Sequence, residues 1–511
     1  EHTGSPTVIL AKTIKGWTLG PTIEARNATH QIKKMTKEEL RTLRDRLFLH
    51  DEIPDEALDA DLPPYYRPPE DSPEMQYLRE RRRALDGSLP RRVVRAKPLE
   101  MPAESVFDQL YRGSGSQARS TTMAFAGLLR NLMRDPAVGR RVVPIVPDEA
   151  RTFGLDALFK EFEIYSPFGQ LYEPVDAGLL LSYKEDTDGQ ILEEGITEAG
   201  AMASFTAAGT AYATWAQPMI PFFIFYSMFG FQRVGDLIWA STDQRARGFL
   251  LGATAGRTTL QGEGLQHDDG HSHVLAAAYP AVRAYDPAFA YELAVIVRDG
   301  IRRMYGPEPE DLIYYITLYN EPYPMPAMPP GVEDQILAGM YRFAPAPEGP
   351  ARRATILFSG SAWGAAAEAQ RLLAENHDVA VELWSVTSYK QLREEALRAE
   401  RWNRLHPGRP QRIPYVTQAL QQTEGPVVAV TDFMKLVPDQ IARWVPHPFM
   451  PLGTDGFGRS DTRAKLRRFF ETDAAHVTVA VLRALGKDDE VADAIARYGI
   501  DPDAPDPSLP G

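Results

Sequence analysis

Short apolar runs separated by helical stretches constrain the fold of this chain most strongly. Residues 142–146, 221–226 and 312–317 are rich in β-branched or aromatic side chains, and each run is about the length of one buried strand. Apolar strands that alternate with helices are typical of a parallel sheet covered on both faces. The sequence therefore predicts an α/β fold.

The chain has 511 residues, enough for about three domains. The segment 1–97 begins with a strand-like run at residues 6–11. It continues with a helix that Thr36 and Glu39 cap as a capping box, and residues 51–100, rich in Pro and charge, are expected to form an extended connector. The segment 98–327 carries the three runs above. Further strands at 354–358, 379–385 and 427–430 make 328–511 a smaller α/β domain.

The composition excludes several classes of function. The net charge is −13, which disfavours nucleic acid or an anionic membrane as a partner. The most apolar stretch, 218–240, includes two prolines together with Arg233 and Asp236, so we interpret it as buried core and not as a membrane span. The chain has no cysteine, which excludes disulfides, thiolate nucleophiles and cysteine-bound metals. Because the chain starts at Glu1 and enters an apolar run almost at once, we expect a fragment of a longer protein.

Glu198 is the first candidate for chemistry. It follows Ile196 and Thr197 at a predicted strand-to-helix turn. A Glu buried there would have a raised pKa and could exchange a proton with a ligand nitrogen. The alternative is an ordinary acid in the first turn of a helix, which the helix dipole favours. On this stretch alone the second interpretation is preferred.

An aromatic stretch follows. Residues 221–231 contain six aromatic side chains in eleven positions, including Tyr226 and Phe229. They could stack on a flat heterocycle, with the tyrosine hydroxyl as a polar contact. The alternative is a strand end packed into the core, and the stretch alone favours it.

Residues 262–273 concentrate three histidines and three acids, including His267, His271 and His273. One hypothesis is a loop that lines an active site and carries an acid–base histidine. Another is a metal site, which would make the protein a metal-dependent hydrolase. The spacing matches no helical zinc motif, so the acid–base loop ranks first.

Two glycine-containing regions complete the candidates. Lys15 and His30 flank Gly16 and Gly20, and a lid with a cation and an imidazole could close on an anionic substrate. Each residue alone is equally compatible with an exposed basic loop. The run 453–461 contains glycines suited to tight turns and resembles no phosphate-binding loop.

Together these stretches resemble the first, decarboxylating component of pyruvate dehydrogenase, of the homodimeric bacterial type. The resemblance covers essentially the whole chain in one collinear order. It rests on five motifs, at residues 148–154, 196–198, 226–233, 262–273 and 453–461.

The resemblance implies a transketolase-like thiamine-diphosphate fold. Residues 1–97 would be the tail of the diphosphate-binding domain with an active-site lid and connector, 98–327 the pyrimidine-binding domain, and 328–511 the C-terminal domain. The family binds the cofactor diphosphate and Mg²⁺ through a Gly-Asp-Gly motif that this chain lacks. The metal ligands are therefore expected upstream, and none is expected in this chain.

The resemblance also implies the roles of single residues. Glu198 would hydrogen-bond the pyrimidine ring nitrogen, Phe229 would stack on the ring, and Ile196 and Tyr226 would lie against it. His267, Tyr226, Lys15 and His30 would face pyruvate.

The expected reaction is the oxidative decarboxylation of pyruvate with acetylation of a lipoyl domain of dihydrolipoamide acetyltransferase. A cytoplasmic homodimer is expected, with no nucleic-acid or membrane partner. A non-catalytic dimerisation module stays open as an alternative, because the diphosphate motif is missing.

Overall fold

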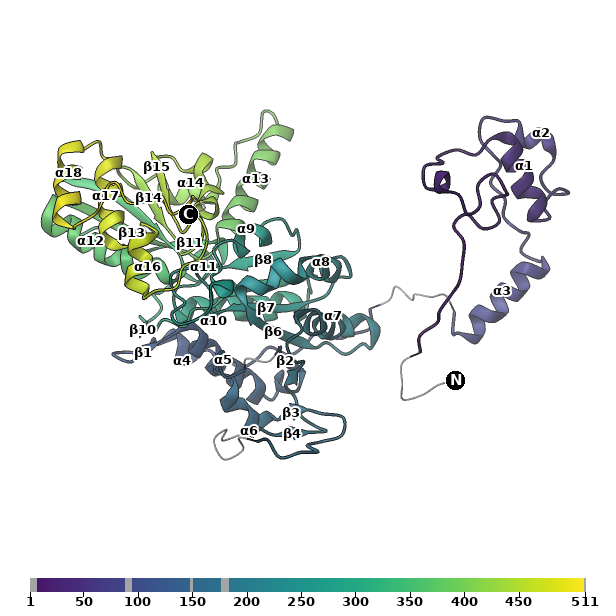
Figure 1. Cartoon of the computed structure of the whole chain (residues 1–511), viewed down its shortest axis with the longest axis horizontal. Helices are drawn as coiled ribbons and strands as arrows, with labels where there is room; N and C mark the ends of the chain where they lie inside the picture. Colours follow the sequence, from purple (N-terminus) through teal and green to yellow (C-terminus); the bar gives the residue numbers. More distant parts are fainter. Residues whose placement is uncertain (1–6, 88–93, 148–149, 176–182, 510–511) are drawn as a thin grey trace. The chain divides into compact units, whose positions relative to one another are not determined.

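The computed structural model describes residues 7–87, 94–147, 150–175 and 183–509. The chain divides into two units, Glu1–Val93 and Val94–Gly511, which we describe separately (Figure 1).

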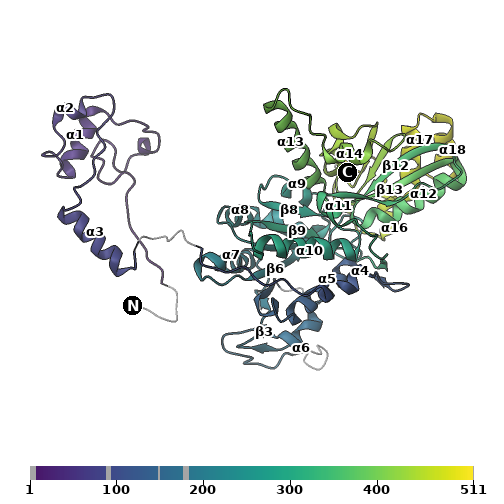
Figure 2. The ribbon, with the colours of Figure 1, turned by 180° about the vertical axis from the view of Figure 1, so that it is seen from behind.

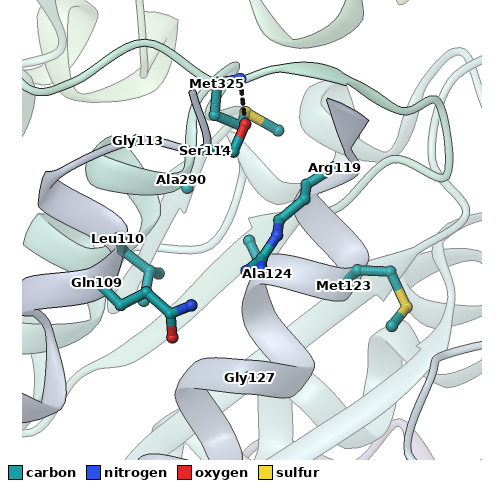
Figure 3. A pocket seen from close by; sticks show the side chains of 10 residues that line it. All are labelled: Gln109, Leu110, Gly113, Ser114, Arg119, Met123, Ala124, Gly127, Ala290 and Met325. Carbon is teal, nitrogen blue, oxygen red and sulfur yellow. Dashed lines mark hydrogen bonds between the residues drawn. The ribbon is translucent and has the colours of Figure 1, made fainter. Parts of the chain in front are cut away.

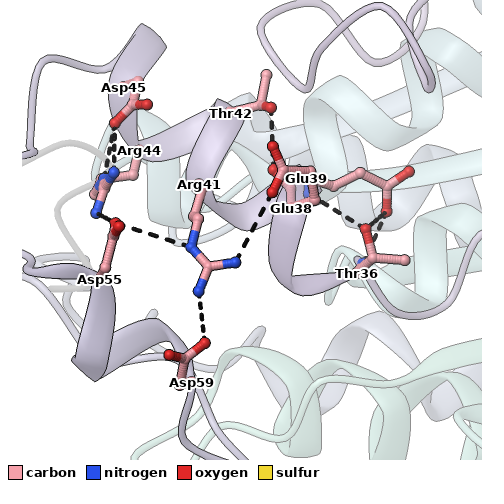
Figure 4. A network of polar contacts seen from close by, with 9 residues as sticks. All are labelled: Thr36, Glu38, Glu39, Arg41, Thr42, Arg44, Asp45, Asp55 and Asp59. Atoms are coloured by element: carbon pink, nitrogen blue, oxygen red, sulfur yellow. Dashed lines mark hydrogen bonds and ion pairs between the residues drawn. The ribbon is translucent and has the colours of Figure 1, made fainter.

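The first unit is helical. Thr36 caps α1 as the sequence predicts: its hydroxyl accepts from the Glu39 amide, and the Glu39 carboxylate accepts from the Thr36 amide at 2.7 Å. Arg44 then ties α1 to α2 through Asp55, at 2.5 Å (Figure 4). The elements of this unit are η1 Asn27–His30, α1 Lys37–Arg46, α2 Asp55–Leu58 and α3 Pro73–Ala84.

Two expectations for this unit are wrong. Residues 7–11 form no strand, and Val8, Ile9 and Leu10 are all more than four-fifths exposed. The described residues of the unit offer them no strand to pair with, and Pro6 lies outside the described residues. The Pro-rich connector contains helices α2 and α3, because Ser72 caps α3 and Pro73 occupies its first turn, where a missing amide is not needed.

The second unit contains the predicted parallel sheet. Its strand order is β5-β2-β6-β7-β9-β8, and every pairing is parallel. The three apolar runs of the sequence correspond to β2, β6 and β9, each within one residue. The strands are β2 Val142–Val146, β5 Leu192–Glu193, β6 Ile220–Tyr226, β7 Gly248–Ala253, β8 Val282–Tyr285 and β9 Ile313–Thr317.

Helices cover both faces of this sheet, as predicted. Phe222 and Ile224 of β6 share a core cluster with helices α5 and α10, whereas Phe223 and Phe225 share another with α7 and α8 (Figure 2). Alternation with a period of two explains this division. The helices and short elements of this part are η2 Glu104–Val106, α4 Asp108–Tyr111, β1 Ala118–Arg119, α5 Thr121–Arg134, η3 Gly139–Arg141, η4 Asp156–Leu158, α6 Phe159–Phe162, β3 Ile164–Tyr165, β4 Glu185–Asp186, α7 Glu198–Thr214, η5 Ser227–Phe229, α8 Gly230–Asp243, η6 Leu265–His267, α9 Ser272–Ala276, α10 Ala290–Tyr305 and β10 Tyr323–Pro324.

A second sheet follows in the C-terminal part, in the order β11-β13-β12-β14-β15, with β11 antiparallel and the rest parallel. Its β12, β13 and β14 confirm the predicted runs. The elements are α11 Glu333–Ala338, β11 Met340–Ala344, β12 Arg352–Phe358, η7 Gly360–Ala362, α12 Trp363–His377, β13 Val379–Val386, α13 Tyr389–Leu405, α14 Tyr415–Leu420, β14 Val427–Val430, α15 Leu436–Asp439, η8 Ala442–Trp444, β15 Phe449–Leu452, α16 Arg463–Phe469, α17 Ala474–Ala484 and α18 Asp488–Arg497.

Candidate active site

A pocket of about 260 Å³ opens at the carboxyl ends of β2 and β6. These strands are neighbours, and ligands of α/β proteins bind at this edge of the sheet because the loops that follow the strands meet there. Five residues that the sequence analysis selected line it. The full lining is Pro147, Phe153, Ile196, Glu198, Tyr226, Phe229, Arg233, Gln266 and His267.

Aromatic rings form one wall of this pocket. Tyr226 is the last residue of β6, and the short turn η5 brings Phe229 back beside it, with ring centroids 5.8 Å apart. The ring centre of Tyr226 lies 5.4 Å from that of Phe153 and 4.3 Å from that of His267. The aromatic stretch therefore serves two purposes: its first residues are core, and its end faces the pocket.

The carboxyl group of the pocket comes from Glu198. This residue begins α7, and the Thr197 hydroxyl caps the helix by accepting from the Gly200 amide at 3.2 Å. The Glu198 side chain is only 12% exposed and lies at the positive end of the helix dipole. The structure thus places Glu198 in the first turn of a helix, as the second interpretation predicts, and its shielded side chain also lines the pocket.

Arg233 is a pocket residue to which the sequence analysis gave no role. Its Nη1 donates to Glu198 Oε1 at 3.0 Å, and its Cζ lies 3.6 Å from the centre of the Phe229 ring. The spacing of four residues between Phe229 and Arg233 is the signal that could have found this contact, because such residues meet on one side of the chain near a helix. A flat ring can stack on the covered side of Phe229 only after the guanidinium moves.

The three histidines of residues 262–273 have different surroundings. His267 faces the aromatic wall, and its Nδ1 lies 3.9 Å from Glu263 Oε2. His271 Nε2 contacts Gln232, and His273 Nε2 lies 3.0 Å from the Thr317 hydroxyl in the core, where burial lowers its pKa. Among the described residues no group of three or more acids and histidines could hold a metal ion.

Lys15 and His30 belong to the first unit. Lys15 Nζ donates to His30 Nδ1 at 2.7 Å, and the pair is exposed. Gly16 and Gly20 beside them have positive φ angles of 75° and 104°, conformations that glycine adopts without strain. The structure therefore brings these two predicted residues to each other.

A smaller cavity lies among α4, α5 and α10 and the segment around Met325 (Figure 3). Its volume is about 30 Å³, the space of about one water molecule. Ser114 lines it and accepts from the Met325 amide at 2.9 Å. It contains none of the predicted site residues.

Asp268, the residue after His267, is buried, with 4% of its surface exposed. Burial raises the pKa of its carboxyl to about 7, although the charge of Arg257 acts in the opposite direction. Below about pH 7 the folded chain therefore favours the protonated form of Asp268.

We expect Asp268→Asn to stabilise the second unit at pH 8 by about 2–4 kcal/mol. An unfolded aspartate has a pKa of about 3.9, so the folded state holds more protons between pH 4 and 7. Its stability is then full below pH 4 and falls as the pH rises through 7. Thermal unfolding at pH 4 and pH 8 checks this, with Asp243→Asn as an exposed control that should change little. An equal effect of Asp268→Asn at both pH values would contradict the assignment.

Solved structures support the fold. Transketolase from Campylobacter jejuni aligns with a TM-score of 0.54 and 12% identity, over 88% of this chain and 56% of that protein. Transketolase from Leishmania mexicana aligns with a TM-score of 0.54 and 14% identity, over 93% of this chain and 56% of that protein. The chain thus has the transketolase-like α/β fold of thiamine-diphosphate enzymes.

Sequence comparisons identify the family within this class. Residues 99–326 match the pyruvate dehydrogenase E1 component middle domain, and residues 339–473 match the transketolase-like C-terminal domain. The pyruvate dehydrogenase E1 component of Mycolicibacterium smegmatis is 54% identical over 98% of this chain, and that of Escherichia coli K12 is 47% identical over 100% of it. The chain belongs to the pyruvate dehydrogenase E1 component family.

The chain spans 55% and 57% of the length of these two relatives, about half of each. Among the helices of the described residues, none is both long and apolar enough to cross a membrane.

Proposed function

We propose that this chain supplies the pyrimidine-binding half of a thiamine-diphosphate-dependent pyruvate dehydrogenase. The complete enzyme would decarboxylate pyruvate oxidatively and acetylate a lipoyl domain of the acetyltransferase. The observation that carries this proposal is the pocket in which a shielded Glu198 faces Tyr226, Phe229 and His267. Relatives named as pyruvate dehydrogenase E1 components support it over nearly the whole chain.

The pocket residues fit the pyrimidine end of the cofactor. Phe229 offers an aromatic face, Ile196 an apolar contact, and Glu198 a carboxyl group for a ring nitrogen. Arg233 would have to leave Phe229 and Glu198 when the ring binds. Bound thiamine diphosphate would supply a carbon nucleophile and an electron sink for decarboxylation. Mg²⁺ and its ligands, expected upstream, stay a prediction.

The chain's own residues would hold and move protons. Glu198 would share a proton with the pyrimidine nitrogen, and the low exposure of its side chain keeps competing water away. His267 and the Tyr226 hydroxyl would face pyruvate and the incoming lipoyl group. Lys15 would attract the pyruvate carboxylate and His30 would transfer protons, from a lid formed by the first unit.

A homodimer is part of the proposal. Helix α7 is apolar on nearly every side, yet Ala199, Ala203 and Ala207 on one side are exposed. A helix that is apolar all round is normally buried, so a second copy packed on this side would account for its composition. The domain limits 1–97, 98–327 and 328–511 and the cytoplasmic location stay predictions.

The two alternative hypotheses receive less support. A hydrolase built on His267, His271 and His273 would need them to converge, but their side chains contact different partners. The non-catalytic module is separated from an enzyme by a direct assay. The full-length product of the gene, with thiamine diphosphate and Mg²⁺, should release CO₂ from pyruvate and reduce ferricyanide. Cofactor binding without any pyruvate-dependent CO₂ would contradict the proposed activity.

Phe229→Ala should weaken the binding of thiamine diphosphate to that protein about tenfold, because one stacked aromatic contact contributes about 1 kcal/mol or more. Isothermal titration calorimetry at saturating Mg²⁺ measures this. Phe168→Ala is the matched control, since Phe168 is 77% exposed and does not line the pocket. Equal affinity of the two variants would exclude Phe229 as the stacking residue.

A further inference from the structure

The loop between β7 and α9 carries His267 and becomes buried immediately after this residue. Gly264, Leu265 and Gln266 are exposed, whereas Asp268 and Asp269 are buried. His267 closes the short helix η6, so the position of its ring depends on how the chain is held at the next residue. The anchor of this loop therefore starts at Asp268.

The anchor is built by the C-terminal part of the chain. Asp268 lies against Gly458, where a Cβ atom would overlap the Asp268 carboxylate, and the backbone amide of the next residue, Arg459, lowers the pKa of that carboxyl. The loop at residues 453–461 is the glycine run to which the sequence analysis assigned only tight turns. The absence of a side chain at Gly458 thus leaves the space that the Asp268 side chain occupies.

A buried arginine, Arg257, makes further contacts with the same glycine loop. Arg257 is 6% exposed, and its Nη1 donates to the Gly456 carbonyl at 2.6 Å and to the Thr454 carbonyl. Its guanidinium also packs on Gly270, where a Cβ atom would overlap it. One cation therefore joins the glycine loop to the segment that follows His267.

A second segment of the C-terminal part, which follows β14, forms hydrogen bonds with both ends of the loop that carries His267. Asp432 accepts from the Thr258 amide at 2.9 Å and from the Thr259 hydroxyl at 2.6 Å. The Met434 amide donates to the Gly270 carbonyl at 2.8 Å. The entry and the exit of the loop are thus fixed to residues 432–434.

We propose that the C-terminal part positions His267 through the contact of Asp268 and Arg257 with the glycine loop 453–461. Asp268 and Arg257 are then positioning residues, and neither lines the pocket itself. The importance of His267 for catalysis rests on the proposed function, but its positioning does not.

Charge makes this anchor sensitive to pH. Asp268 is surrounded by the charges of Arg257, Asp432 and Glu263 and by the Arg459 amide, and burial raises its pKa to about 7. Ionisation favours the state in which the carboxylate reaches water. The anchor should therefore hold His267 less firmly at pH 8 than at pH 6.

Carbethoxylation of histidines by diethylpyrocarbonate, with each site followed by peptide mass spectrometry, tests the proposal on the 511-residue chain. The rate at His267 is divided by the rate at His50, whose side chain is 58% exposed in the first unit. At pH 8 we expect Gly458→Ala to raise this ratio at least fivefold. Gly364→Ala is the matched control, because a Cβ at Gly364 meets no atom within 4 Å.

Asp268→Asn should act in the opposite direction. Its neutral amide keeps the shape of the protonated acid, so the ratio at pH 8 should fall at least threefold below that of the parent, and at pH 6 the two should agree. This variant also decides the question if Gly458→Ala does not fold. An unchanged or higher ratio for Asp268→Asn at pH 8, or parent-like behaviour of a folded Gly458→Ala, would overturn the proposal.

The readout separates this inference from the proposed activity. Labelling rates need neither cofactor nor pyruvate, so they can support the anchor even if the full-length protein releases no CO₂. Conversely, if the enzyme is active but neither variant changes the labelling of His267, the proposed function is supported and the proposed positioning of His267 is wrong.

Discussion

Glu198→Gln should lower pyruvate turnover of the full-length protein by about 10²–10⁴-fold, the usual share of an acid–base group. The amide keeps the size of the side chain and can still accept from Arg233, but it has no proton to share with a ring nitrogen. Because Glu198 is assigned to the cofactor and not to pyruvate, the KM for pyruvate should change little. Steady-state ferricyanide reduction at saturating cofactor measures both quantities.

The control for this variant is Glu194→Gln. Glu194 lies four residues earlier, accepts from the Ser204 hydroxyl on α7, and does not line the pocket. Its turnover should stay within threefold of the parent. Arg233→Met adds a further comparison, because it removes the ion pair while the acid remains. If Glu198→Gln turned over pyruvate within threefold of the parent, the proton role of Glu198 would be wrong.

The sequence predicted the sheet well where the strands are continuous apolar runs. Strands β2, β6 and β9 were located within one residue, because a strand buried on both faces needs such runs. The edge strand β5 has only two residues and left no pattern. Strand β7, Gly248–Ala253, carries a glycine at its start and another near its end, which hides it among turns.

The first unit shows the limits of local patterns. The run at residues 7–11 has strand propensity but pairs with no strand in the described part of the unit, and propensity alone does not make a strand. In contrast, the cap of α1 was predicted correctly, since Thr36 and Glu39 satisfy each other's backbone locally. The cap of α3 was missed because charge and proline dominated the segment around it.

The candidate site could be selected only by combining distant stretches. Glu198 alone resembles a first-turn acid, and the aromatic stretch alone resembles core; the structure shows that each is partly so. Ile196 and Glu198 follow β5, Tyr226 ends β6, and His267 follows β7; the parallel order of these strands brings the four residues to one edge of the sheet and into one pocket. The ion pair of Arg233 with Glu198, and the contact of Asp268 with Gly458, join residues far apart in the chain and leave almost no local signal in the sequence.

Removal of the Glu292 side chain should cause a large loss of stability in the second unit. Glu292 is fully buried in the first turn of α10, where Oε2 accepts from the Ala288 and Phe289 amides at 2.6 and 3.1 Å. Its Oε1 accepts from the Tyr341 and Ser385 hydroxyls of β11 and β13, at 2.7 Å each. One carboxyl group thus joins the helix of the first sheet to two strands of the second.

Glu292→Ala leaves these four donors without their acceptor, and an unsatisfied buried donor costs about 1–3 kcal/mol. We expect a loss of at least about 4 kcal/mol, and Glu292→Gln should lose less because its carbonyl can still accept on one side. Since the acid bridges both sheets, hydrogen exchange should rise in α10 and in β11 and β13 together. Asp334→Ala, an exposed acid in the first turn of α11, is the control and should change stability by about 0.5 kcal/mol or less. A loss confined to α10, with β11 and β13 still protected, would show that the two sheets are stabilised independently of this acid.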